Sequence, residues 1–220
     1  MKYDVLVFDM DGVLVDVTDS YRETIIRTVH HYTGKQIAPE TIQDYKNQGG
    51  WNNDWALSQR IAADLGVKVE YATVVDHFNR LFLDEGLIHR ERWIPTDGLV
   101  DRLGARYELA IFTGRSTREA GITLDRMSLG QRFLVITSSD VEREKPAPDG
   151  LLKIKAQKPG KRLLYIGDTV DDARSGKAAG VDFIGIAARA NPRYHELAAV
   201  LNAEGAIAVL DDINQLETVL

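Results

Sequence analysis

The sequence predicts an α/β fold, with a doubly wound, Rossmann-like parallel sheet as its core and a helical subdomain inserted after the first strand. Three observations support this fold class. Short apolar runs rich in β-branched residues recur along the chain, helical periodicity fills much of the space between them, and one long helical stretch separates the first two runs. Continuous apolar strands that alternate with helices indicate a parallel sheet covered on both faces.

Six apolar runs are the predicted strands of this sheet. They are Tyr3–Phe8, Leu109–Phe112, Phe133–Thr137, Leu163–Ile166, Phe183–Ile186 and Ala206–Leu210. Helices are predicted between several of them, at Ser116–Met127, Asp171–Ala179 and Pro192–Asn202. We therefore assign residues 1–16 and 94–220 to the α/β core.

Residues 17–93 are predicted to form the inserted subdomain. Apolar residues recur there at three- and four-residue intervals in four segments, which are Ser20–His31, Pro39–Tyr45, Trp55–Leu65 and Tyr71–Leu83. A crossover between parallel strands needs only one helix, so four helices indicate an insertion. We expect it to join the core near Val15–Val17 and Trp93–Pro95.

The composition excludes several classes of protein. The 220 residues include no cysteine, which rules out a disulfide scaffold, a cysteine-ligated metal site and a cysteine nucleophile. The 27 Lys and Arg residues against 33 Asp and Glu residues form no polybasic block, so neither nucleic acid nor a membrane is an expected partner. Apolar runs such as Val5–Phe8 fall far short of the roughly 18 residues of a membrane span. We expect a cytoplasmic protein, monomeric or homodimeric.

Polar residues follow the predicted strands at the points where ligands bind in open α/β sheets. The first strand ends in Asp9-Met10-Asp11-Gly12, the second in Thr113-Gly114-Arg115, and the fourth in Gly167-Asp168 with Asp172 close behind. Lys145 lies between the third strand and the next helix. Carboxylates crowded at one sheet edge need a cation, and an all-oxygen cluster suits Mg²⁺ together with a substrate phosphate.

The order of these motifs is more specific than any one of them. Asp-x-Asp-Gly alone is typical of a turn or a helix cap. Asp9-Met10-Asp11-Gly12-Val13, then Thr113, then Lys145 before a Pro-x-Pro, then Gly167-Asp168 with Asp172 resemble the four ordered motifs of the haloacid dehalogenase superfamily. The insertion is similar to the helical cap of that family, in particular of its phosphoglycolate phosphatase and β-phosphoglucomutase-like subfamily.

The resemblance implies a covalent mechanism. Asp9 would be the nucleophile that accepts the phosphoryl group, and Asp11 would protonate the leaving oxygen and then activate water. Thr113 and Lys145 would hold the transferring oxygens, and the backbone of Gly114 would help to bind phosphate.

The same resemblance implies a Mg²⁺ site as the cofactor. Asp9, the backbone carbonyl of Asp11, and Asp168 would be ligands, and Asp172 would bind the ion or orient its waters. Asp171 is adjacent, so it is an alternative to Asp172 or shares its duty.

Two further regions are candidates for binding the substrate. Arg115 follows the second strand and is expected to touch substrate, although a surface arginine at the start of a helix is the alternative. The loop from Lys46 to Asp54 is expected to meet the leaving group through Trp51 and Asn52. The alternative for this glycine-rich loop is a flexible break followed by a helix cap.

The predicted function is that of a Mg²⁺-dependent phosphatase acting on a small phosphorylated metabolite through an aspartyl phosphate. Asp11 argues against a dehalogenase, because those members of the family lack an acid at this position. Val13 occurs in some sugar phosphomutases as well as in phosphatases, so a phosphomutase is the alternative enzyme. A binding or regulatory module without catalysis is the alternative of another class. The sequence does not specify the leaving group.

Overall fold

The computed structural model describes residues 2–220 and contains a six-stranded sheet with the order β5-β4-β1-β6-β7-β8. Every neighbouring pair in this sheet is parallel. The strands are β1 (Val5–Phe8), β4 (Glu108–Phe112), β5 (Leu134–Ile136), β6 (Leu163–Gly167), β7 (Asp182–Ile186) and β8 (Ala208–Leu210). The chain therefore winds outward in both directions from β1 and β6 at the centre, as a doubly wound sheet does.

Helices cover both faces of this sheet, because alternate residues of the buried strands point to opposite sides. Leu6 and Phe8 of β1 share one core with α5 (Leu99–Gly104), α6 (Thr117–Arg126) and η5 (Ile213–Thr218). Val5 and Val7 share the other core with α7 (Asp149–Gln157), α8 (Val170–Ala179) and α9 (Tyr194–Ala203). The predicted fold class is confirmed.

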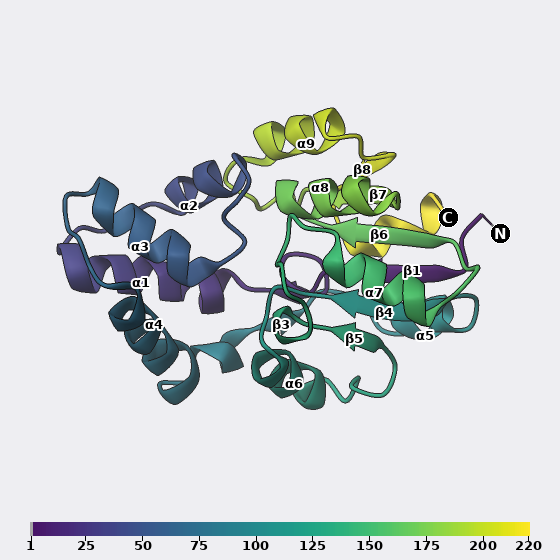
Figure 1. The fold of residues 1–220 in the computed structure, drawn as a ribbon, viewed down its shortest axis with the longest axis horizontal. Coiled ribbons are helices and arrows are strands. Elements are labelled where there is room, and N and C mark those ends of the chain that lie inside the picture. The colour runs from purple at the N-terminus through teal and green to yellow at the C-terminus, as the bar shows by residue number, and fades with distance from the viewer. Residues whose placement is uncertain (1) are drawn as a thin grey trace.

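The helices formed by residues 18–90 lie together at one end of the molecule, opposite the end where both termini lie (Figure 1). They are η1 (Thr18–Arg22), α1 (Glu23–Thr33), α2 (Pro39–Lys46), α3 (Asp54–Asp64), α4 (Tyr71–Asn79), η2 (Arg80–Asp84) and η3 (Leu87–Arg90). Local signals set their bounds: Gly34 ends α1 in the left-handed conformation, and the Asn53 side chain accepts a hydrogen bond from the Ala56 amide at the start of α3. The division at residues 17 and 93 stays a prediction.

Both connections of the inserted helices pass through one short antiparallel ribbon. Its strands are β2 (Val15–Asp16) and β3 (Arg92–Trp93), with Val15 opposite Trp93 and Asp16 opposite Arg92. Arg92 and Asp16 also form an ion pair of 2.8 Å. The ribbon therefore holds the two connections side by side, a few residues after Asp9.

No helix formed by residues 2–220 has the length and apolar character that are needed to cross a membrane.

Candidate active site

The turn after β1 brings two carboxylates toward the end of β6. Asp9 follows β1 directly, and its amide donates to the carbonyl of Ile166 over 2.8 Å. Gly12 has φ of +73°, and a Cβ atom at this position would overlap the carboxylate of Asp168. The Asp-x-Asp-Gly pattern thus has a spatial reason, since only glycine lets the turn approach Asp168 so closely.

Lys145 holds two buried carboxylates together beneath this turn. Its ammonium lies 2.8 Å from Asp9 Oδ1 and 2.7 Å from Asp172 Oδ1, and all three side chains are at least nine-tenths buried. Asp172 Oδ1 also accepts the Tyr165 hydroxyl at 2.5 Å, and its Oδ2 accepts the amide and hydroxyl of Thr169. Asp172 is thereby fixed by hydrogen bonds to three residues.

The carboxylates of this cluster outnumber the Lys145 ammonium that pairs with them. Burial above all raises the pKa of Asp9 to about 7, with the Asp172 and Asp11 carboxylates adding to the rise against the effect of Lys145. Burial, and next the Asp172 and Asp9 carboxylates, raise the pKa of Asp168 well above its usual value. For Asp172 burial is outweighed by Lys145 and the hydrogen bonds, which lower its pKa. One ammonium group therefore pairs with two buried carboxylates, and the carboxylate of Asp168 lies close to both.

These carboxylates fit a Mg²⁺ ion. One oxygen each from Asp9, Asp168 and Asp172 lies within 4.8 Å of the others. Asp168 Oδ1 is buried and has no hydrogen-bond partner among residues 2–220, so an acceptor with no donor faces the cluster. Oxygen donors of this kind and a deficit of positive charge are what a hard divalent cation requires. Asp171 points elsewhere and accepts the Gly50 amide at 2.7 Å.

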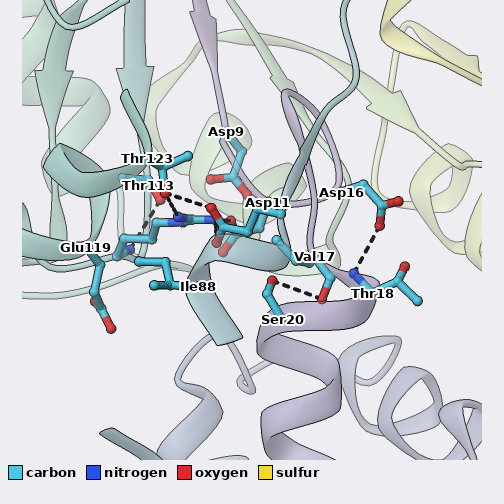
Figure 2. A network of polar contacts seen from close by, with 12 residues as sticks. Asp9, Asp11, Asp16, Val17, Thr18, Ser20, Ile88, Thr113, Glu119 and Thr123 are labelled. Carbon is cyan, nitrogen blue, oxygen red and sulfur yellow. Dashed lines mark hydrogen bonds and ion pairs between the residues drawn. The ribbon is translucent and has the colours of Figure 1, made fainter. Parts of the chain in front are cut away.

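A second network of charges joins Asp11 to the inserted helices. The side chain of Arg115 is 1% exposed. Its guanidinium donates hydrogen bonds to Asp11 Oδ1 and to the Thr123 hydroxyl, and it forms an ion pair with Glu91 Oε1. Figure 2 shows Asp11 between Asp9 and the first residues of the insert. Burial raises the pKa of Glu91, against the effect of the Arg115 guanidinium.

A cavity lies between these networks and the inserted helices. Residues of the core line one side of it, including Asp9, Asp11, Gly114, Arg115, Glu144 and Asp168, and residues of the insert line the other, including Tyr21, Arg22, Lys46, Asn52, Asp54 and Trp55. Arg22 Nη1, Asn52 Nδ2 and Trp55 Nε1 are buried donors that have no hydrogen-bond partner among residues 2–220. The insert thus contributes several unpaired N–H groups to a cavity whose other side is lined by carboxylates.

The loop from Lys46 to Asp54 meets the core at Gly114. A Cβ atom at Gly114 would overlap the side-chain amide of Asn52, so the two segments are in close contact. Lys46 is paired with Asp54 at 2.7 Å, which ties the two ends of the loop together. The structure brings Asn52 to the cavity, whereas Trp51 packs edge-on against Tyr45 with ring centroids 5.7 Å apart.

Thr113 directly precedes Gly114, which lines the cavity. It is 1% exposed, and its hydroxyl accepts the Arg115 amide at 3.2 Å. That hydroxyl keeps its own proton for donation.

Several residues of the site were missed by the sequence analysis. They are Tyr21, Arg22, Trp55, Glu91, Thr123, Glu144 and Tyr165. None of them belongs to a sequence pattern that points to the site: only the tertiary structure shows that they line the cavity or contact Arg115 or Asp172. The pattern Thr169-x-x-Asp172, by contrast, is a capping box, and the structure contains that box at the start of α8.

Comparison with known proteins gives a family match over most of the chain. The family described as haloacid dehalogenase-like hydrolase matches residues 6–186. The pyrophosphatase PpaX of Bacillus mycoides (strain KBAB4) is 27% identical in an alignment of 225 positions that covers 100% of this chain and 98% of that protein. The phosphoglycolate phosphatase of Pseudomonas putida (strain KT2440) is 26% identical and covers 96% of this chain, with 78% of its own length matched.

Two further comparisons cover a longer protein and a solved structure. The imidazoleglycerol-phosphate dehydratase of Phytophthora nicotianae is 31% identical over 193 residues, and this chain spans only 42% of its length. A haloacid dehalogenase-like protein of Agrobacterium tumefaciens, whose crystal structure is known, superposes with a TM-score of 0.80 at 23% identity, covering 99% of this chain and 97% of that one. The structural likeness supports the fold.

Proposed function

The chain belongs to the haloacid dehalogenase-like hydrolase family, and from this premise we propose that it is a Mg²⁺-dependent phosphatase of small phosphorylated metabolites. The observation that carries the proposal is the cluster of Asp9, Asp168 and Asp172, in which the ammonium of Lys145 pairs with Asp9 and Asp172. This cluster combines a buried carboxylate nucleophile, a cation that orients it and an unpaired acceptor that suits a metal ion. Phosphoryl transfer needs these three features at one place.

In the proposed reaction, a carboxylate oxygen of Asp9 forms a bond to phosphorus while the bond from phosphorus to the leaving oxygen breaks. Asp11 gives its proton to that oxygen, so an alcohol departs and an aspartyl phosphate remains. Asp11 then takes a proton from water, which attacks phosphorus and releases phosphate and the free Asp9 carboxylate. Lys145, only 2.8 Å from Asp9, keeps the nucleophile in place. The Thr113 hydroxyl and the Gly114 amide hold the phosphoryl oxygens.

A Mg²⁺ ion, when bound, supplies the positive charge that lets a phosphate dianion approach these carboxylates. Asp9, Asp168 and the backbone carbonyl of Asp11 would hold it. The oxygens of Asp172 already accept three hydrogen bonds and form an ion pair with Lys145. Asp172 would therefore fix Lys145 and orient water around the ion. Asp171 would instead keep its hydrogen bond from the Gly50 amide and would not bind the ion.

The unpaired donors on the insert suggest the chemistry of the leaving group. Arg22, Asn52 and Trp55 present N–H groups to the cavity opposite Asp9. We propose that residues 17–93 act as a cap and that these donors bind a leaving group with its own acceptor oxygens, preferably an anionic one. The relatives named for phosphoglycolate and pyrophosphate are consistent with this, because both of those compounds carry a second acidic group.

The test is release of inorganic phosphate from a panel of phosphorylated metabolites, with Mg²⁺ and with excess EDTA. We expect turnover with Mg²⁺ only, and faster turnover for substrates whose leaving group carries a carboxylate or phosphate. Asp9→Asn should abolish turnover, since an amide cannot attack phosphorus. Asp125→Asn, on the exposed side of α6, is the matched control and should keep wild-type activity.

Two results would contradict the proposal. Undiminished turnover by Asp9→Asn would exclude the aspartyl phosphate, and full activity in EDTA would exclude the metal. Isomerisation of a phosphosugar without net release of phosphate would identify the phosphomutase alternative.

A further inference from the structure

We infer that Arg115 and Glu91 position the carboxylate of Asp11 for its work as acid and base, an inference that rests on the proposed phosphatase function. Arg115 would hold Asp11 directly. Glu91, which lies on the connection by which the insert returns to the core, would hold Arg115. The direct contact with substrate that the sequence predicts for Arg115 stays a separate prediction.

The contacts of Arg115 with Asp11 leave one carboxylate oxygen free. Nε and Nη2 of Arg115 both approach Oδ1 of Asp11, at 2.8 Å and 2.5 Å, and neither donates to Oδ2. The Asp11 side chain is 32% exposed and lines the cavity. A carboxylate anchored through one oxygen has a fixed orientation, and its second oxygen is available to exchange a proton with a bound molecule.

Glu91 completes the neutralisation of Arg115. Its side chain is 0% exposed and its Oε1 lies 2.8 Å from Nη2 of Arg115. Its Oε2 accepts the Thr123 hydroxyl at 2.7 Å, and Thr123 accepts Nη1 of Arg115 at the same distance. Without Glu91 the buried guanidinium would have Asp11 as its only anionic partner within these contacts. The Arg115 guanidinium therefore lies between the carboxylates of Asp11 and Glu91 and pairs with both.

Arg115 also touches both connections of the insert. Glu91 lies between η3 and β3 on the returning connection, and the ring of Tyr21, in η1 on the outgoing connection, has its centroid 4.9 Å from the guanidinium carbon. Asp11 and Thr123, the partners from the core, are labelled in Figure 2. The anchor of Asp11 thus depends on where the insert lies, because each shift of the two connections changes the surroundings of Arg115.

A positioning role differs from a purely structural one in its dependence on the leaving group. An alkyl alcohol is a poor leaving group and needs a proton as the bond to phosphorus breaks. The p-nitrophenolate anion departs without one. A misplaced Asp11 should therefore slow the first chemical step with an alkyl phosphate and leave it almost unchanged with p-nitrophenyl phosphate.

The experiment measures the rate of leaving-group release in a single turnover, which separates transfer to Asp9 from the later hydrolysis that both substrates share. The variants are Glu91→Gln, which keeps the size and one acceptor oxygen but removes the charge, and Arg115→Lys, which keeps the charge but loses the two-nitrogen contact with Asp11. We expect a loss of roughly 10- to 100-fold with the best alkyl phosphate of the panel and less than about threefold with p-nitrophenyl phosphate.

The matched control is Arg126→Gln. Arg126 approaches the same Glu91 carboxylate at 3.4 Å but has no contact with Asp11 among those described for residues 2–220, so both substrates should react within about twofold of the wild-type rate. Thermal melting of each variant establishes that it is folded.

Equal losses on both substrates in folded Glu91→Gln and Arg115→Lys, or no loss on either, would overturn the inference while the phosphatase function stands. A wild-type protein that releases no phosphate from any substrate would overturn the proposed function itself.

Discussion

At the scale of single residues, the main feature of the site is that several carboxylates lie close together. Asp168 has a buried oxygen without a hydrogen-bond partner among residues 2–220, and its neighbours Asp9 and Asp172 are carboxylates. A group that ionises reluctantly when folded but freely when unfolded makes stability depend on pH. The sequence placed Asp9 and Asp168 at this edge through the rule for strand ends, but it could not show that Tyr165 and Lys145 converge on Asp172.

Replacement of Asp168 by asparagine should change this pH dependence in the metal-free protein. The folded pKa of Asp9 is about 7 against 3.8 for an ordinary aspartate, and the pKa of Asp168 is raised in the same direction. The folded state therefore binds more protons than the unfolded state between about pH 4 and pH 7, so this contribution to stability is present at low pH and is lost as the pH rises. Asp168→Asn removes one of the carboxylates that repel each other in this cluster.

We compare the melting temperatures of Asp168→Asn and the wild-type protein in EDTA. The difference between them should change by at least ~2 °C in favour of the variant from pH 5 to pH 8, which corresponds to about 1 kcal/mol in the free energy of unfolding. Addition of Mg²⁺ at pH 8 should stabilise the wild-type protein and not the variant. Parallel pH profiles for the two proteins would show that Asp168 carries no electrostatic penalty.

At the scale of elements, the six predicted strands all occur, because a buried parallel strand is a continuous apolar run that sequence displays directly. The helices of the insert were also predicted, but two of them are each divided into two consecutive elements: η1 is followed by α1, and α4 is followed by η2. β2 and β3 were missed. A two-residue strand has no periodicity, and its pairing depends on a partner far along the chain: Trp93 lies 78 positions after Val15.

The contact between the loop from Lys46 to Asp54 and the strand end at Gly114 is an element-scale feature that a single methyl group can test. Gly114→Ala would place a Cβ atom against the Asn52 amide, so the loop must shift away from the cavity. We expect kcat/KM for the best metabolite to fall about tenfold and the melting temperature to change by no more than about 2 °C, because a flexible side chain gives way rather than the core.

Gly121→Ala is the control for this substitution. Gly121 lies within α6, and a Cβ atom there would meet nothing within 4 Å. Alanine should stabilise the helix by up to about 1 kcal/mol and leave kcat/KM unchanged. If Gly114→Ala keeps full activity on the metabolite, the loop does not bind the leaving group.

At the scale of the whole molecule, the inserted helices rest on the core through polar contacts near α8 and α9. The Gly50 amide donates to Asp171 at 2.7 Å, and Arg193 pairs with Asp44 of α2 at 2.7 Å. Asn191 donates to Gln43 at 3.0 Å. Contacts of this kind are individually weak, so they suit a surface that opens to admit a substrate and closes over it. The sequence predicted the cap but not this surface, whose residues share no pattern along the chain.

Loosening this surface should expose the Gly50 amide without unfolding the protein. Arg193→Ala removes an ion pair whose two side chains are 36% and 49% exposed. Such pairs contribute about 0.2–1 kcal/mol, so their loss shifts the balance between open and closed forms by up to about fivefold. Hydrogen exchange measures this balance, since the Gly50 amide is bonded to Asp171 only while the insert rests on α8.

We expect the Gly50 amide to exchange up to about fivefold faster in Arg193→Ala, while amides of β4, an inner strand of the sheet, keep their wild-type rates. Arg189→Ala is the matched control, because Arg189 forms a 2.8 Å ion pair with Asp211, which lies within the core. That pair does not join the insert to the core, so the Gly50 amide should keep its wild-type rate in this variant. Equal exchange at Gly50 in all three proteins would mean that the ion pair between Arg193 and Asp44 does not hold the insert closed, whereas faster exchange throughout β4 would indicate global unfolding rather than movement of a cap.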